Sequence, residues 1–177
     1  MYFANFPLIV YDSVGDGNFK IVTNLLKRVA LRTKVRTNIL LYDTYDVKEG
    51  ETPEMIADKL YDDSQLHWVV LFVNNITDRY HQWPMNFGQF NTFVNDKYTD
   101  INAVHHYEIT QTSGDTSISI DIGTDTTGYS EVDLTTITNY EFEIERQDTL
   151  RKIRLLDGAY IEQFVQEFET LMGASVL

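Results

Sequence analysis

Two short runs of the chain, from Thr52 to Tyr61 and from Leu66 to Asn74, place apolar residues at helical spacing. The first run starts with Thr52 as an N-cap and Pro53 at the first helical position, where a missing N–H costs nothing. Either Asp63 or Ser64 can cap the second helix, which is apolar on nearly every side and therefore expected to be buried. We expect both helices and a preceding strand to build a core from Tyr45, Val47, Ile56, Leu60, Leu66, Trp68, Val69, Leu71 and Val73.

The pattern before this core predicts an N-terminal arm and a helix. Residues 2–11 form an aromatic-rich extended segment, closed by a turn at residues 15–18. Apolar residues in Phe19–Leu31 share one helical face, which predicts a helix there. Asn38–Tyr42 is the expected strand that leads into the core.

The pattern after the core changes twice. Phe87–Tyr98 fits a short helix or an aromatic-rich loop, and residues 107–138 are rich in Thr, Ser, Asp and Gly. Ile118, Ile120 and Ile122 alternate with polar residues between Gly turns, which predicts a hairpin or small sheet. Glu141–Glu145 alternates in the same way and is expected to be a strand.

The C-terminal part predicts a strand over residues 151–156 and a helix over residues 159–172. The expected fold class is therefore α+β: a small core with an N-terminal arm and helix, an inserted β-hairpin or sheet and a C-terminal helix. We divide the chain into residues 1–44, 45–84 and 85–177, and expect one compact subunit rather than independent domains.

Charge and composition exclude several classes of partner. Fourteen basic against 27 acidic residues give a net charge of −13, which disfavours nucleic acid and anionic membrane surfaces. The N-terminus has no basic leader, and no run approaches the roughly 20 apolar residues of a membrane span. We expect a soluble protein or a component of an assembly. The absence of cysteine removes disulfides and thiol chemistry.

Two features of composition permit two interpretations each. The 11 Tyr and 10 Phe residues favour burial among partner proteins, or equally a Tyr-rich core of the chain itself. The basic cluster is either a solvated helix end or a contact to an acidic neighbour, with the first more common; it comprises Lys27, Arg28, Arg32, Lys34 and Arg36.

No residue pattern indicates catalysis. The four histidines lack metal-ligand spacing, and His105 and His106 would point to opposite faces of a strand. The acidic run that starts at Asp121 departs from a calcium loop, and no nucleophile elbow is present. We therefore predict that the protein is not an enzyme and uses no metal or cofactor.

The segment from Tyr45 to Asn74 resembles a LysM module, with Tyr45-x-Val47, Gly50-Glu51-Thr52, Ile56-Ala57-x-x-Leu60-Tyr61, Trp68 and Asn74 in order. The resemblance implies a LysM-like βααβ-type core, and a groove that in such modules binds N-acetylglucosamine polymers. Here the corresponding groove residues, which we expect to take a protein segment instead, are Gly50, Glu51, Thr52, Asn74 and Asn75. The segment after Asn75 departs from the LysM pattern.

A wider resemblance covers most of the chain. The aromatic arm Phe6-Pro-x-Ile-x-Tyr11, the module with Leu66-x-Trp68-Val-x-Leu71, and the ending from Leu150 to Met172 resemble, in this order, the small LysM-like baseplate wedge subunit of T4-type contractile-tailed bacteriophages. The resemblance implies a structural virion protein of the tail baseplate, assembled in the host cytoplasm. It also implies several copies around the hub, joining wedge subunits and neighbouring wedges.

The implied partners are the inner-ring wedge subunits and the small sheath-like wedge subunit. The residues that we expect to reach them are Phe3, Phe6, Ile9, Tyr11, Tyr80, Trp83, Phe164 and Phe168. The main alternative is a LysM-type protein that binds peptidoglycan or N-acetylglucosamine, and a small tail-associated hydrolase is a further one.

Overall fold

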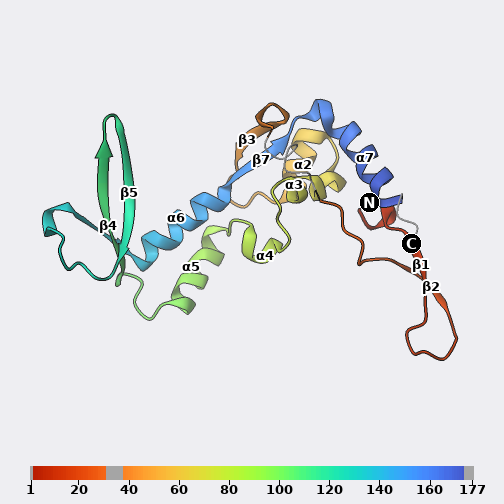
Figure 1. Ribbon diagram of the computed structural model, residues 1–177, viewed down its shortest axis with the longest axis horizontal. Coiled ribbons are helices and arrows are strands. Elements are labelled where there is room, and N and C mark those ends of the chain that lie inside the picture. Colours follow the sequence, from red (N-terminus) through yellow and green to blue (C-terminus); the bar gives the residue numbers. More distant parts are fainter. Residues whose placement is uncertain (1, 31–37, 174–177) are drawn as a thin grey trace. The chain divides into compact units, whose positions relative to one another are not determined.

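The computed structural model describes residues 2–30 and 38–173. They form two compact units (Figure 1). Unit 1 holds residues up to Val47, Glu51–Gln82 and the part from Ile153 onward, and unit 2 holds Lys48–Gly50 and Trp83–Lys152. The second unit is thus inserted in the sequence of the first.

Unit 1 begins with a short 3-10 turn, η1 (Tyr2–Asn5), and an antiparallel hairpin of β1 (Leu8–Tyr11) and β2 (Lys20–Thr23). The predicted helix over Phe19–Leu31 is therefore wrong within the described residues, because residues 20–23 pair with β1 instead. Leu25 and Leu26, which would have faced a core from that helix, are 61% and 89% exposed.

The core of unit 1 is formed by α2 (Pro53–Tyr61), η3 (Ser64–Leu66) and α3 (His67–Val73), with β3 (Tyr42–Asp46) paired to β7 (Lys152–Leu156). Thr52 accepts a hydrogen bond from the Met55 N–H, so α2 starts where the sequence predicts. Asp63, rather than Ser64, caps the next element by accepting from Gln65. The strand predicted at Asn38–Tyr42 is instead the 3-10 turn η2 (Ile39–Leu41), and β3 starts at Tyr42.

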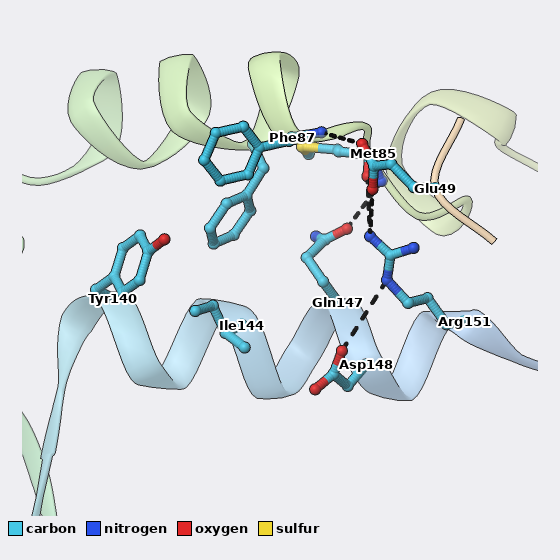
Figure 2. A pocket seen from close by; sticks show the side chains of 9 residues that line it. Glu49, Met85, Phe87, Tyr140, Ile144, Gln147, Asp148 and Arg151 are labelled. Atoms are coloured by element: carbon cyan, nitrogen blue, oxygen red, sulfur yellow. Dashed lines mark hydrogen bonds and ion pairs between the residues drawn. The ribbon is translucent and has the colours of Figure 1, made fainter. Parts of the chain in front are cut away.

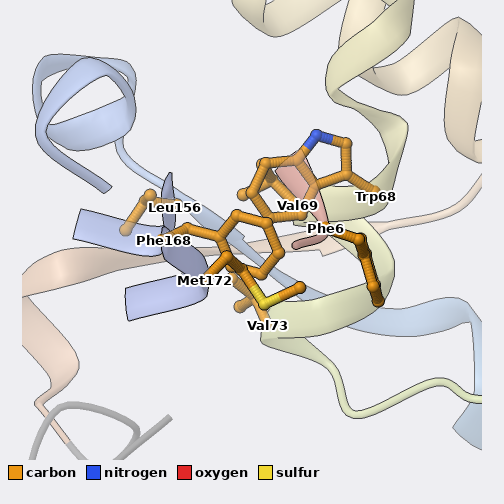
Figure 3. Close-up of a cluster of buried hydrophobic side chains, with 7 residues drawn as sticks. All are labelled: Phe6, Trp68, Val69, Val73, Leu156, Phe168 and Met172. Carbon is orange, nitrogen blue, oxygen red and sulfur yellow. The ribbon is translucent and has the colours of Figure 1, made fainter. Parts of the chain in front are cut away.

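The last helix, α7 (Ile161–Gly173), follows the turn η5 (Gly158–Tyr160) and confirms the helix predicted over residues 159–172. It closes the core of unit 1 from the C-terminal side, where Phe168 and Met172 join the buried cluster that contains Trp68 (Figure 3). The ring centroids of Trp68 and Phe168 lie 4.5 Å apart. Phe6 joins the same cluster from the N-terminal arm, so segments from both ends of the chain complete this core.

Unit 2 contains α5 (Phe87–Lys97), α6 (Asn139–Arg151) and a three-stranded antiparallel sheet in the order β5-β4-β6. Its strands are β4 (Val104–Ser113), β5 (Thr116–Gly123) and β6 (Leu134–Thr138), which follows the turn η4 (Glu131–Asp133). The β4–β5 pair confirms the predicted hairpin. Of the two alternatives predicted for Phe87–Tyr98, the helix is the correct one, since α5 covers Phe87–Lys97. The strand predicted at Glu141–Glu145 is wrong, because a reciprocal pair of hydrogen bonds between Thr138 and Glu141 starts α6 there.

None of the helices in the described part of the chain is long and apolar enough to cross a membrane. The short helix α4 (Arg79–Gln82) completes unit 1. Among the described residues, no three histidine, cysteine or carboxylate side chains are grouped to hold a metal ion.

Candidate protein-protein interface

The hairpin of β1 and β2, residues 8–23, exposes apolar side chains that no other element of the described residues covers. Val10 pairs with Ile21 and Leu8 with Thr23, which places Leu8, Val10 and Ile21 on one face. These three side chains are 67%, 67% and 72% exposed. Phe19 and Val14, in the connecting loop, are 67% and 80% exposed. Contiguous exposed apolar surface of this kind marks interaction sites in soluble proteins.

The loop of this N-terminal hairpin is ordered by its own polar groups. One carboxylate, that of Asp12, accepts hydrogen bonds from the N–H groups of Val14, Gly15 and Gly17 at 2.7–3.2 Å. Gly15 and Gly17 have φ of 77° and 80°, which a side chain would strain. These N–H groups, that of Gly17 foremost, lower the pKa of Asp12. A two-stranded hairpin is marginal by itself, so an ordered loop helps to keep its apolar face presented.

The aromatic residues expected to reach partners separate into two groups. Phe3, Tyr11 and Tyr80 are 59%, 53% and 87% exposed, and Ile9 and Phe164 are half-buried. The other three are buried in the chain itself, which corrects their assignment to interface arms: Phe6 at 8%, Trp83 at 7% and Phe168 at 3% exposed. Phe6 and Phe168 belong to the same buried cluster as Trp68, so part of the aromatic excess belongs to the core.

Three of the five residues expected to line a partner groove have hydrogen bonds within the chain. Asn74 joins two segments of unit 1: its Nδ2 donates to the carbonyls of Val70 and Arg154 at 2.8 and 2.7 Å, and its Oδ1 accepts from the Arg154 N–H. Thr52 caps α2, and Glu51 accepts a hydrogen bond from the Tyr45 hydroxyl. Asn75 is exposed, and Gly50 belongs to unit 2. Neither cavity described below is lined by these five residues.

The residues expected in the module core lie at different depths. Val47, Ile56, Trp68, Val69 and Val73 are at most 7% exposed. Tyr45, Leu66 and Leu71 are half-buried. Leu60 is 41% exposed and is corrected to the surface: it lies one turn after the buried Ile56 and Ala57, near the end of α2, and borders a cavity.

The basic cluster is described only in part. Lys27 Nζ donates to the carbonyls of Leu171 and Met172 at the end of α7, the first at 2.7 Å. A cation there is favourable because the C-terminal end of a helix is negative. Arg32, Lys34 and Arg36 lie outside the described residues.

A cavity of about 150 Å³ opens in unit 2 between α5 and α6 (Figure 2). Phe87, Phe90 and Ile144 give it an apolar lining, and Glu49 and Arg151 form an ion pair at its rim with 3.1 Å between Oε2 and Nη2. The N–H of Phe87 donates to Glu49, and this bond, ahead of Arg151, lowers the pKa of Glu49. The cavity is too small for a drug-sized ligand, since such pockets measure about 300–1,000 Å³.

A second cavity, of about 120 Å³, lies beside β3 and β7 in unit 1. Tyr61 lines it and donates its hydroxyl to the carbonyl of Leu156 at 2.9 Å. Burial raises the pKa of Tyr61 to about 12, so this phenol stays protonated and serves as a hydrogen-bond donor. No nucleophile and base among its lining residues are paired.

Sequence reasoning missed the apolar face of the N-terminal hairpin. Leu8 and Val10 alternate in the sequence, which is a strand signal, but Ile21 and Val22 were assigned to a helix. Only the pairing of Val10 with Ile21 shows that three apolar side chains lie together on one face, where the described part of the chain leaves them exposed.

These observations fit the class of structural subunits, with apolar strand residues exposed on the N-terminal hairpin. Residues 1–117 match the family model of the base plate wedge protein 53, and the chain belongs to this family. It is also similar to the baseplate wedge protein gp53 of Enterobacteria phage T4, with 23% identity over 145 residues that cover 75% of this chain and 74% of that protein. The chain is therefore a structural component of the phage tail baseplate.

Proposed function

We propose that this protein joins wedge subunits to one another and to neighbouring wedges around the hub, and that the N-terminal hairpin is its docking arm. The exposed apolar face of Leu8, Val10 and Ile21 carries this proposal. A wedge protein has to bind other baseplate proteins, and exposed apolar strands gain stability when a partner removes them from water. The partners we propose are the inner-ring wedge subunits and the small sheath-like wedge subunit.

We also propose that unit 1 contains a LysM-like core. The order β3, α2, α3 and then β7 paired with β3 supports a βααβ core in which unit 2 and α4 are inserted before the last strand. Glycan binding, the alternative function, is disfavoured because the side chains of Thr52 and Asn74 are already hydrogen-bonded within the chain. Groups engaged in this way are not free to bind a sugar.

Reconstitution with the neighbouring wedge proteins tests the docking arm. Val10→Thr with Ile21→Thr keeps β-branched residues in the strands but removes apolar surface. We expect the double variant to bind the wedge proteins at least about tenfold more weakly, which is roughly 1.4 kcal/mol. The complex is quantified by native mass spectrometry and sedimentation.

The matched control is Val104→Thr, at a 43% exposed position of β4 outside the hairpin, which should bind like the unmodified chain. Equal affinity of the hairpin variant and the control would rule out this docking arm. Retention of the full chain on peptidoglycan or chito-oligosaccharide beads would instead support the glycan-binding alternative.

A further inference from the structure

Strand β5 forms an open edge of the sheet in unit 2. It pairs with β4 alone in the order β5-β4-β6. Within the described residues, no backbone group of Thr116–Ile122 makes a hydrogen bond outside the ladder with β4. Along the other side of β5, alternate N–H and C=O groups therefore point away from the sheet, as they do at any edge strand.

This edge has none of the usual protection against strand addition. Natural edge strands carry Lys or Pro, are very short, or are twisted away by bulges. Thr116–Gly123 is eight residues long, contains no Lys, Arg or Pro, and has Asp121 as its single charged residue. The one register irregularity of the β4–β5 pair lies at Tyr107/Glu108, beside the end of β5.

One face of the sheet at this edge is apolar. Ile109 of β4 pairs with Ile120 on one side and with Leu134 on the other, which gives an apolar row across all three strands. Ile118, on the same face of β5, is 53% exposed. An added strand would extend this row and cover Ile118.

The charge of the surrounding segment indicates what kind of strand fits. Residues 98–145 contain no Lys or Arg, and their ten carboxylates are Asp100, Glu108, Asp115, Asp121, Asp125, Glu131, Asp133, Glu141, Glu143 and Glu145. Glu143 is paired with Lys97, and Glu108 lies 3.3 Å from His106 Nε2, but within the described residues no Lys or Arg forms an ion pair with a carboxylate of the sheet or its turns. A second copy of this chain would bring the same negative charge, which disfavours self-pairing.

We propose that β5 accepts an extended, Lys- or Arg-bearing segment of a neighbouring polypeptide as a fourth strand of this sheet. Backbone hydrogen bonds along Thr116–Ile122 supply affinity, apolar residues at every second position cover Ile118, and the cations meet Asp115, Asp121 and Asp125. The inference rests on the proposed function, because it names the chemistry of one partner segment, but it concerns a site separate from the N-terminal hairpin.

Hydrogen exchange on the full-length chain tests this with a defined probe, the peptide Lys-Val-Lys-Val-Thr-Val-Lys-Val-Lys. The control peptide replaces its central Thr and both flanking Val residues with Pro, which keeps the charge and removes strand N–H groups. We expect the first peptide to slow the exchange of alternate β5 amides, those that point away from β4, and the control peptide to leave them unchanged.

Two matched variants separate edge binding from charge attraction. Ile118→Lys places a cation on the apolar face of the edge strand, whereas Thr112→Lys adds the same charge to the other face of β4. We expect Ile118→Lys to weaken peptide binding at least about tenfold and Thr112→Lys by no more than about twofold, measured by fluorescence anisotropy.

The proposal is overturned if the peptide leaves the exchange of the β5 amides unchanged or does not bind at all. It is also overturned if both variants lose the same affinity for the peptide. Protection of β5 that rises with the concentration of this chain alone would show that a second copy occupies the edge, and would overturn it too. If the peptide does not bind β5 but the wedge proteins still bind through the N-terminal hairpin, the proposed function is unaffected.

Discussion

At the scale of residues, polar side chains connect segments that are far apart in the sequence. Asn74 links α3 to β7 through both its amide nitrogen and its oxygen. Glu143 has a fully buried side chain on α6, where it accepts hydrogen bonds from Lys97 and from the hydroxyl of Tyr98 at 2.8 Å. A buried carboxylate is stable only when it is paired in this way, so Glu143 fixes the contact between α5 and α6.

The pH dependence of stability tests the role of Glu143. Burial raises its pKa, but the hydrogen bonds from Lys97 and Tyr98 outweigh burial, so the folded-state pKa is lower than the ordinary value of 4.5. The stabilisation is therefore present above pH 4.5 and is lost as the pH falls through the folded-state pKa. Glu143→Gln should lower the free energy of unfolding at pH 7 by about 1–3 kcal/mol and weaken its dependence on pH below 4.5.

Urea unfolding at pH 7 and at acid pH, with far-UV circular dichroism, measures both effects. Glu145→Gln, at an exposed position of the same helix, is the control and should match the unmodified chain. If Glu143→Gln showed the same acid sensitivity as that control, the carboxylate would not be stabilised by its partners.

At the scale of elements, caps decide where helices begin and thereby override apolar alternation. Phe142 and Ile144 alternate with glutamates, which is the pattern of a strand. The Thr138 hydroxyl accepts from the Glu141 N–H at 3.2 Å, and the Glu141 carboxylate accepts from the Thr138 N–H at 2.9 Å. This capping box satisfies N–H groups that a helix start leaves unpaired, so the segment folds as α6.

The cap of α6 is testable by a conservative pair of substitutions. Thr138→Ala removes the hydroxyl acceptor and should lower the free energy of unfolding by about 0.5–2 kcal/mol. Thr138→Ser keeps the hydroxyl and should cost much less. Thermal unfolding of the two variants gives the comparison; similar losses for Ala and Ser would mean that the hydroxyl does not hold the helix start.

At the scale of the whole molecule, the sequence order of the elements differs from their packing. The last strand and α7 pack with the first part of the chain, and Trp83–Lys152 folds as a unit between them. Segments that we assigned together as residues 85–177 are thus divided between two units. Both units expose apolar strand residues: Leu8, Val10 and Ile21 in the first, and Ile118 of β5 in the second.

Removal of α7 tests this organisation. A chain that ends at Asp157 lacks Phe168 and Met172, which belong to the same buried cluster as Trp68 and Val73. Loss of one such buried side chain costs about 2–5 kcal/mol, so the core of unit 1 should no longer fold cooperatively. Hydrogen exchange should show α2 and α3 amides unprotected, while α5 and α6 keep their protection.

The control for this truncation is Leu171→Ala in the full chain, since Leu171 is 53% exposed and should leave exchange in α2 and α3 unchanged. Simultaneous loss of protection in α5 and α6 would show that the two units do not fold separately.

The sequence by itself determined those features that depend on neighbouring residues. Thr52 and Pro53 start α2, the Gly114 turn connects β4 to β5, and the apolar face of residues 161–172 makes α7, because caps, turns and helical periodicity act within a few residues. The order of aromatic and apolar motifs also indicated the baseplate wedge family, to which the chain belongs.

Only the tertiary structure decided which surfaces are covered. Phe6 and Phe168 are buried while Leu8, Val10 and Ile21 are exposed, although all are apolar residues in amphipathic or alternating segments. Periodicity shows which side chains share a face but not whether another segment packs on that face. Whether a face is covered depends on contacts between residues far apart in the chain. The same holds for the pairing of β3 with β7, which unit 2 separates in the sequence.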